Sequence, residues 1–489
     1  MAFPVTFAGL TTAQMASLDQ MFQIVGNIGA IPCTAAGTNL ITLTPSAGIT
    51  PAVNTYANYL QFSFVASSTS TGPVSLQVGS LGALPVYLPT GTQAGSGGLA
   101  GNALYVIAFN QNLNSGGGGW QIIAGPTIAV NAALTTGRNR MINGGQDIDQ
   151  RNEGAVVTIN NQSITAGNQF IADQTLCFFS GLATNVTAQR VAVTGLAGFT
   201  YGTQVTIGSA GASVGLQDYL HLTQHAEGIN VADLGFGTAV AQPVSTGVWI
   251  NSSVGGQVGI SLRNSAGTRS YVSITNTTAG VWTFCPVANI PGDTVGTWLA
   301  GAGQIGINYS IALMAGTGRQ TASANTWTTT NNIATSGQTN ITTTGGATFI
   351  VTGLSLEPGA VTNTFDRRPY PTEVGLCQRY YEKSYDIGTA VGNLDSIGAF
   401  YMLYTYTGTP GANEFGGFVT HKVAKNTDPT VSFYAPITGH LSVGTNYGTN
   451  ADVSIVLPLT PGETGFPWEA SITSAQVNFG FHWTSEAGL

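Results

Sequence analysis

The sequence predicts a mostly β protein with an N-terminal short helix plus small β-domain, a central jelly-roll-like β-sandwich and a C-terminal β-domain. The first reason is that glycine is very frequent, at 66 of 489 residues, and turn formers separate short runs of β-branched and aromatic residues. The second is that 43% of the chain is hydrophobic, which suffices for packed cores, whereas only 7% is charged. A single core rarely extends over so long a chain, so we expect several domains.

The N-terminal segment, residues 1–30, carries a helical pattern. Met15, Leu18, Phe22 and Val25 follow the alternating spacing of three and four residues that marks a coiled-coil stripe. Two interpretations stay open. The helix packs on its own domain, or it forms an anchor, as a seam between copies of the chain or a peg that docks into a partner.

Residues 31–127 predict a small β attachment module. Phe62 and Phe64 alternate with polar positions, and glycine-rich turns follow such runs. Residues 128–137 have the character of a linker.

The central region, residues 138–372, predicts a two-sheet β-sandwich, because strand patterns recur with no helical pattern between them. The cleanest strand signal is one alternating series: Ile305, Ile307, Tyr309, Ile311 and Leu313. The exception is the segment 218–229, for which we expect a turn-like or briefly helical insertion.

Residues 373–489 predict a separate C-terminal β-domain. Tyrosine becomes dense there, and the three lysines of the chain all lie in it: Lys383, Lys422 and Lys425. The shift in composition marks the domain boundary.

Charge and cysteine usage exclude several classes of function. The net charge is −8 and the 13 basic residues are scattered, so no nucleic-acid partner is expected. No apolar run reaches about 18 residues and the N-terminus lacks a signal pattern, so neither membrane insertion nor secretion is expected. The cysteines lie far apart, which argues against a disulfide framework and for small buried side chains: Cys33, Cys177, Cys285 and Cys377.

No catalytic residue, metal site or cofactor is predicted. His221 and His225 have a spacing that suits a metal on a helix, but Leu222 stands where a zinc protease motif needs glutamate. Nucleophile-elbow and phosphate-loop motifs do not occur. Glycoside hydrolysis needs only two carboxylates, so a polysaccharide-degrading enzyme stays open as an alternative.

Two irregular motifs flank the predicted sandwich. The first reads RNRMINGG at 138–145 and IDQRNEGA at 148–155, and the second reads LEPG at 356–359, TFDRRP at 364–369 and CQRYY at 377–381. Both resemble motifs of phage and prophage tail-fibre proteins, in which they bracket a carbohydrate-binding-like β-sandwich. The bracketed region covers about half of this chain.

The charged groups of these motifs suit a structural role, since arginine forks fit carboxylates. We expect them to clamp strand ends, and contact with a ligand is the alternative. The groups are Arg151, Arg367 and Arg368 with Asp149, Glu357 and Asp366.

The resemblance implies a virion protein: a tail fibre that binds a host receptor and assembles as a homotrimer in the host cytoplasm. Its implied partners are itself, other phage tail or baseplate proteins, and host cell-surface polysaccharide or lipopolysaccharide. The N-terminus would anchor the fibre. The rivals are a polysaccharide-degrading tailspike enzyme and a purely structural head or collar fibre.

We place the expected glycan contact in residues 377–489, because sugars stack on aromatic rings beside amides and carboxylates. Trp468 is the first candidate, since Gly465 to Pro467 before it predict an exposing loop. The alternative is that such rings form the core. The remaining candidates are Tyr404, Tyr406, Tyr434 and Tyr447.

Overall fold

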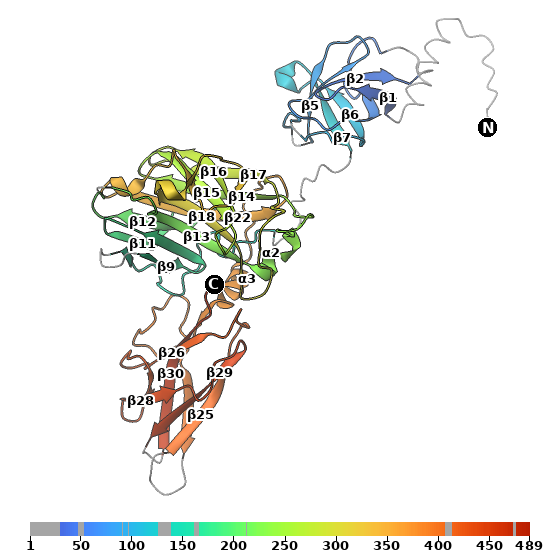
Figure 1. Ribbon diagram of the computed structural model, residues 1–489. Coiled ribbons are helices and arrows are strands. Elements are labelled where there is room, and N and C mark those ends of the chain that lie inside the picture. The colour runs from blue at the N-terminus through green and yellow to red at the C-terminus, as the bar shows by residue number, and fades with distance from the viewer. Residues whose placement is uncertain are drawn as a thin grey trace, which may run out of the picture. The chain divides into compact units, whose positions relative to one another are not determined.

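A computed structural model describes residues 30–46, 53–89, 91–95, 97–125, 138–160, 166–211, 213–405, 413–472 and 476–489. The predicted N-terminal helix with its stripe from Met15 to Val25, the linker 128–137 and Tyr406 lie outside these residues. The chain divides into two compact units, residues 1–134 and 135–489. Figure 1 shows a molecule that is mostly β, as the sequence predicts.

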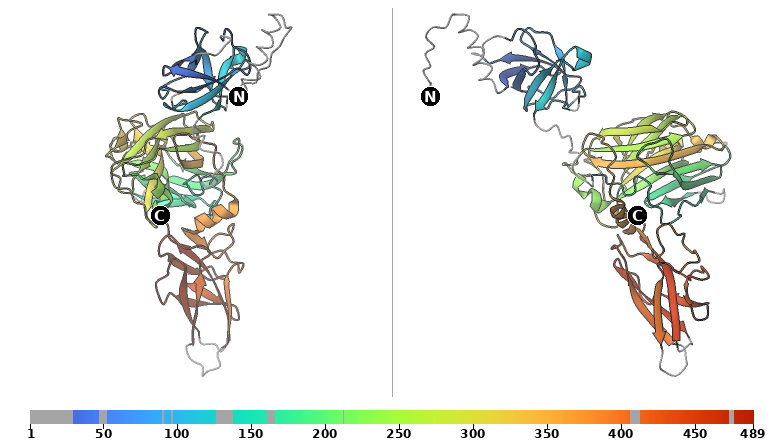
Figure 2. Two further views of the ribbon diagram at one scale, coloured as in Figure 1. Left: turned by 90° about the vertical axis from the view of Figure 1, so that its right-hand side faces the viewer. Right: turned by 180° about the vertical axis from the view of Figure 1, so that it is seen from behind.

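The first unit is a closed barrel of seven short strands, drawn in blue in Figure 2. Around the barrel they run β1 (Ile31–Ala36), β2 (Leu40–Pro45), β4 (Ser75–Val78), β5 (Leu84–Tyr87), β7 (Gly119–Ala124), β6 (Leu104–Asn110) and β3 (Gln61–Val65). Trp120 is fully buried in the interior, where the rings of Phe62 and Phe109 lie edge-on to it at 5.5 and 5.4 Å. The predicted alternation at Phe62 and Phe64 is thus confirmed, because both side chains point inward.

The central part of the second unit is a sandwich of two antiparallel sheets. The seven-stranded sheet runs β20 (Trp327–Thr328), β16 (Ser270–Thr277), β15 (Gly256–Arg263), β18 (Ile305–Ala315), β13 (Tyr219–Glu227), β10 (Thr175–Ser180) and β9 (Ala166–Ala172). The six-stranded sheet runs β17 (Thr283–Ile290), β14 (Val244–Ser252), β22 (Thr348–Pro358), β12 (Tyr201–Ile207), β11 (Val186–Ala192) and β8 (Val157–Asn160).

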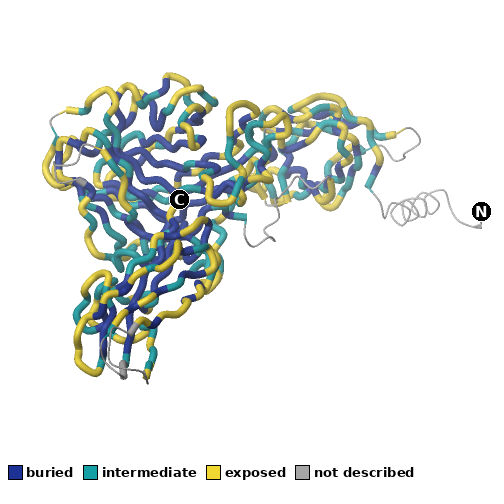
Figure 3. Tube along the Cα trace, turned by 60° about the horizontal axis from the view of Figure 1, so that its bottom comes forward, coloured by how far each residue is buried: buried dark blue, intermediate teal, exposed yellow. Residues whose placement is uncertain are grey.

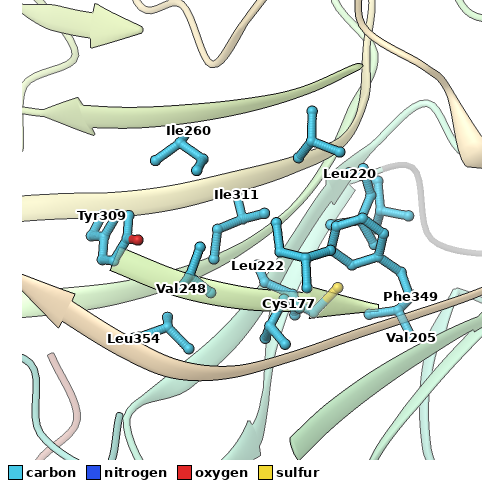
Figure 4. Packing of buried hydrophobic residues seen from close by; sticks show 14 of the residues in the cluster. Cys177, Val205, Leu220, Leu222, Val248, Ile260, Tyr309, Ile311, Phe349 and Leu354 are labelled. Carbon is cyan, nitrogen blue, oxygen red and sulfur yellow. The ribbon is translucent and has the colours of Figure 1, made fainter. Parts of the chain in front are cut away.

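The sandwich core fills the space between these sheets. In Figure 4, Ile311 and Tyr309 of β18 lie among Ile260, Val248 and Leu354 from other strands. The alternating series that predicts β18 is confirmed, since all but its half-buried first member are at most 1% exposed. In the tube of Figure 3 the buried segments form the interior of the unit.

The segment 218–229 is not the predicted insertion. Residues 219–227 form β13, and its neighbours are β10 and β18. Leu220, Leu222 and Ala226 point into the core with the period of two that a strand requires. The prediction was wrong because Gln224 interrupts the inward apolar series after two members, so that the period of two is short in the sequence.

The C-terminal part of the second unit is an eight-stranded arrangement. Its path runs β23 (Tyr381–Lys383), β30 (Gln476–Glu486), β27 (Val443–Asn446), β28 (Ala451–Val456), β29 (Gly465–Ile472) and β25 (Asn413–Thr420), while β24 (Phe400–Thr405) and β26 (Thr430–Tyr434) also pair with β30. It has its own aromatic core.

Short elements complete the fold. They are η1 (Asn114–Gly116), α2 (Gly228–Val231), η2 (Ala232–Leu234), η3 (Thr317–Arg319), β19 (Gln320–Thr321), β21 (Ala334–Thr335), η4 (Ile341–Thr343) and α3 (Tyr370–Gln378). All four cysteines are free, as predicted, and three of them are buried.

Candidate functional site

The two sequence motifs come together around a cavity of about 540 Å³, which we call the motif cavity. Residues 139–153, 365–373 and 387–388 contribute to its lining, together with Arg190, Thr200 and Tyr201 of the sandwich. Segments that are more than 200 residues apart thus share one wall.

Several charged side chains of the motif cavity are paired with other groups of the motif segments. Arg367 Nη1 lies 2.8 Å from Asp147 Oδ2, and Arg368 Nη1 lies 3.1 Å from Glu373 Oε2. Asp366 accepts hydrogen bonds from the main-chain N–H groups of residues 138 and 139. These groups hold the motif segments to one another.

Burial of charge in the motif cavity is unfavourable for Glu153. It forms an ion pair with Lys383, whose side chain is fully buried. Burial nevertheless raises the pKa of Glu153 to about 7, against the lowering effect of Lys383. The pair is a structural tie between the sandwich and the C-terminal strands.

The predicted clamp role of the motif arginines is confirmed, although several partners differ from those expected. Arg151 lies between the rings of Phe170 and Tyr381, with its Cζ atom 3.9 and 4.3 Å from their centroids, and it pairs with Glu486. Glu357 is paired with Arg138 at 3.4 Å. These partners lie far apart in the sequence and are brought together only by the tertiary packing.

A second cavity, of about 260 Å³, lies on the face of the seven-stranded sheet that points away from the sandwich core. We call it the sheet-face cavity. Strand register places its side chains in rows: Phe178 lies beside His221, and His225 and Arg263 both lie beside Asn308. Four neighbouring strands therefore build one floor.

A chain of polar contacts crosses this floor. His221 Nδ1 lies 2.6 Å from Thr223 Oγ1, which lies 2.8 Å from Ser310 Oγ. Arg263 donates from Nη2 to Ser310 Oγ at 2.8 Å and from Nη1 to Asn331 Oδ1 at 2.7 Å. These bonds fix the Arg263 guanidinium in place.

Aromatic rings form the other part of the lining. The rings of Phe178 and His221 stack, with centroids 5.3 Å apart and planes inclined by 7°. Tyr219 lies 5.4 Å from His221, and the guanidinium of Arg319 lies over the Tyr219 ring at 5.0 Å. Rings, amides and two guanidinium groups thus share one small cavity.

The charged side chains that line the sheet-face cavity are all basic. No aspartate or glutamate occurs among its lining residues. Burial, and then the charge of Arg319, lower the pKa of Arg263 to about 10. Burial and these arginines also lower the pKa of His221 well below its usual value, which keeps that imidazole neutral.

Trp468, the first residue predicted for glycan contact, lies in the core instead. It belongs to β29 rather than to a loop, is 1% exposed, and packs at 5.0 Å from the Phe481 ring and 5.5 Å from the Phe479 ring. The prediction of an exposed ring was wrong, because Gly465 to Pro467 continue a strand that pairs with β25.

The other predicted rings are not gathered into one site. Tyr404 stacks on Phe415 at 5.2 Å against the C-terminal core. Tyr434 is half-buried beside Tyr385, and Tyr447 is half-buried with its hydroxyl 3.3 Å from Ser396 Oγ. Two rings of the C-terminal strands are largely exposed instead: Tyr401, at 59%, and Phe418, at 58%.

Sequence reasoning missed the sheet-face cavity. One signal was present: in β13 the polar positions 219, 221, 223 and 225 have the period of a strand face. The contributions of Arg263, Arg319 and Asn331 had no sequence signal, since they lie on other strands and loops.

Other kinds of site find no support in the described ranges. No group of three or more histidine, cysteine or acidic side chains that could hold a metal ion occurs there. Within those same ranges, none of the helices is long and apolar enough to span a membrane.

Comparison with known proteins gives distant likenesses. No family model and no curated protein matches the chain. Among solved structures, an arabinose-bound α-L-arabinofuranosidase is 10% identical with a TM-score of 0.24, covering 51% of this chain and 31% of its own. A family 11 carbohydrate-binding module from Clostridium thermocellum is 11% identical with a TM-score of 0.20, covering 42% and 98%. TM-scores this low do not establish a shared fold, so the likenesses carry no inference here.

Proposed function

We propose that this protein is a bacteriophage tail fibre that binds host surface glycan without cleaving it. The observation that carries the binding role is the sheet-face cavity, whose lining brings together aromatic rings, amides and two arginines. The tail-fibre assignment is supported by the two motifs at residues 138–155 and 356–381 and by a sparsely charged chain built of β modules.

The chemistry of the cavity suits a sugar. Sugar rings present C–H faces that pack on aromatic side chains, and the rings of Tyr219 and Phe178 are part of the lining. Sugar hydroxyls need fixed hydrogen-bonding groups, which Asn308 and Asn331 supply beside the rings. Most of the lining side chains are polar or charged, so the cavity offers several hydrogen-bonding groups to a ligand that is rich in hydroxyls.

This proposal moves the glycan contact from residues 377–489 to the sandwich. Trp468 cannot reach a ligand without disrupting the C-terminal core. Tyr401 and Tyr447, whose ring centroids are 6.0 Å apart, remain the rival contact in the C-terminal part.

Single ring truncations separate these two locations. In the full-length protein, Tyr219→Ala should weaken binding to purified host polysaccharide by about tenfold, the equivalent of about 1.4 kcal/mol. Tyr401→Ala, the matched control, should leave binding unchanged, and thermal melting should verify that both variants fold. The opposite pattern would place the contact in the C-terminal part, and an unchanged affinity in both variants would reject both sites.

The absence of cleavage has its own test. Prolonged incubation of the protein with that polysaccharide should release no new reducing ends and no acyl groups. Their appearance would favour the polysaccharide-degrading alternative.

The virion roles complete the proposal. The first 127 residues anchor the fibre to other tail proteins, and three copies assemble. A protein that starts at Ile128 should be soluble and fail to join virions, and light scattering of the full chain at micromolar concentration should give a trimer mass. A monomer mass, or truncated fibres on virions, would contradict this part of the proposal.

A further inference from the structure

We propose that the sheet-face cavity binds an anionic group of the glycan, a carboxylate or a phosphate, between Arg263 and Arg319. The inference rests on the proposed function and specifies the chemical class of its ligand. The ion pairs of the arginines throughout the chain support it.

The chain has 13 basic residues, of which three are lysines and ten are arginines. All ten arginines lie in the part of the chain that the structure describes. Eight form ion pairs with carboxylates within 4.0 Å. The two with no ion pair among the described residues are Arg263 and Arg319, and both line the sheet-face cavity.

Unpaired cations at such a place are costly. Arg263 is half-buried next to the like charge of Arg319, and both effects lower its pKa. The Nε atoms of both arginines are buried without a hydrogen-bond partner in the described structure. Buried charges are normally paired, and no carboxylate among the described residues neutralises these two guanidinium groups.

The geometry of the two arginines suits an oxyanion attached to a sugar. Guanidinium groups bind carboxylate and phosphate through paired, charge-assisted hydrogen bonds. Arg263 is held by Ser310 and Asn331, while Arg319 lies over the Tyr219 ring. A sugar bound in the cavity beside Phe178 would therefore place an acidic substituent close to both cations.

Asn331 is a neutral partner of the Arg263 guanidinium at a position where an aspartate would neutralise its charge. Its Oδ1 atom accepts from Arg263 Nη1 at 2.7 Å, and an aspartate there would keep that bond and complete an ion pair. Since an amide occupies this position, the charge of Arg263 stays available to a ligand.

The test compares acidic and neutral sugars on the full-length protein. Glucuronate and glucose 6-phosphate are titrated by calorimetry or ligand-observed NMR against glucose as the neutral reference. We expect at least a tenfold preference for one of the two acidic sugars, and the preferred one identifies the carboxylate or the phosphate as the ligand group.

Two variants tie that preference to the cavity. Asn331→Asp preserves the contact with Arg263, and Arg319→Gln removes one cation. Each should lower the ratio of the affinity for the acidic sugar to the affinity for glucose at least tenfold, because each removes net positive charge from the cavity. Arg140→Gln is the matched control, because it removes the same charge from a surface pair with Asp233 outside the cavity.

The outcomes separate this inference from the proposed function. If the wild-type protein binds host polysaccharide but prefers neither acidic sugar, the anion site is wrong and glycan binding stands. The same holds if folded Asn331→Asp and Arg319→Gln proteins keep the wild-type preference. If no polysaccharide binds the wild-type protein at all, both proposals fail.

Discussion

Arginine side chains line both the motif cavity and the sheet-face cavity, but their pairing differs between the two. In the larger motif cavity, Arg367 and Arg368 are matched with Asp147 and Glu373, so arginine holds chain segments together. In the smaller sheet-face cavity, Arg263 has amide and hydroxyl partners but no carboxylate partner among the described residues. What sets the sheet-face cavity apart is therefore unpaired charge, rather than the amount of charge or the size of the cavity.

The sequence context of the two cavities differs as well. The motif cavity is built by the conspicuous segments 138–155 and 364–381, whose function is to join the sandwich to the C-terminal strands. Buried Glu227 makes the same kind of tie, since it accepts from Tyr380 at 2.7 Å and from Arg379 at 2.8 Å. Recognisable motifs here mark the scaffold, and the candidate binding site lies apart from them.

The comparison predicts the largest stability effect in the motif cavity. Arg368→Ala would leave Glu373 without its cation and would remove donors to the main chain of Asn139 and Met141. We expect a loss of about 3–5 kcal/mol in unfolding free energy, because both partners are largely buried. Chemical denaturation measures it, and polysaccharide binding by the folded fraction should be normal. A loss below about 1 kcal/mol would show that the motif pairs are not structural.

A pH effect of intermediate size should arise beside the sheet-face cavity. Burial, and to a lesser extent Arg263, lower the pKa of His225 to about 4, despite a hydrogen bond to the main-chain oxygen of Leu489 that raises it. The unfolded chain takes up this proton near pH 6.5 and the folded chain only near pH 4, so stability is lost as the pH falls through that window. The loss amounts to at most about 3 kcal/mol.

The variant that isolates this effect is His225→Gln, which keeps a donor for Leu489 and cannot titrate. Denaturation curves between pH 7 and 4 should show a shallower acid loss in the variant than in the wild type. Other groups contribute equally to both proteins, including Glu153, whose raised pKa acts in the opposite direction. Identical pH dependence of the two proteins would contradict a buried neutral His225.

The smallest stability effect is expected where binding should change most. Arg319→Ala removes a cation that has no ion pair and relieves its repulsion with Arg263. Unfolding free energy should change by less than about 1 kcal/mol. Melting curves with and without the acidic sugar should show that ligand-induced stabilisation is lost in this variant. A destabilisation as large as that of Arg368→Ala would mean that Arg319 is another structural clamp.

The sequence by itself determined the β architecture, the inward faces of many strands and the clamp role of the motif arginines. It could do so because apolar alternation at Phe62 and Phe64 or from Ile307 to Leu313 is a local property that fixes which face is buried. It misplaced Trp468 because the exposure of a ring depends on the strands packed against it, here β24 and β30.

Only the tertiary structure decided where a ligand could bind. The sheet-face cavity joins Phe178, Tyr219, Arg263 and Arg319, which come from different strands and loops and meet through strand register. Ion pairing between arginines and carboxylates likewise depends on which side chains the fold brings close together. No local pattern encodes that eight of ten arginines are paired, or that the remaining two share one cavity.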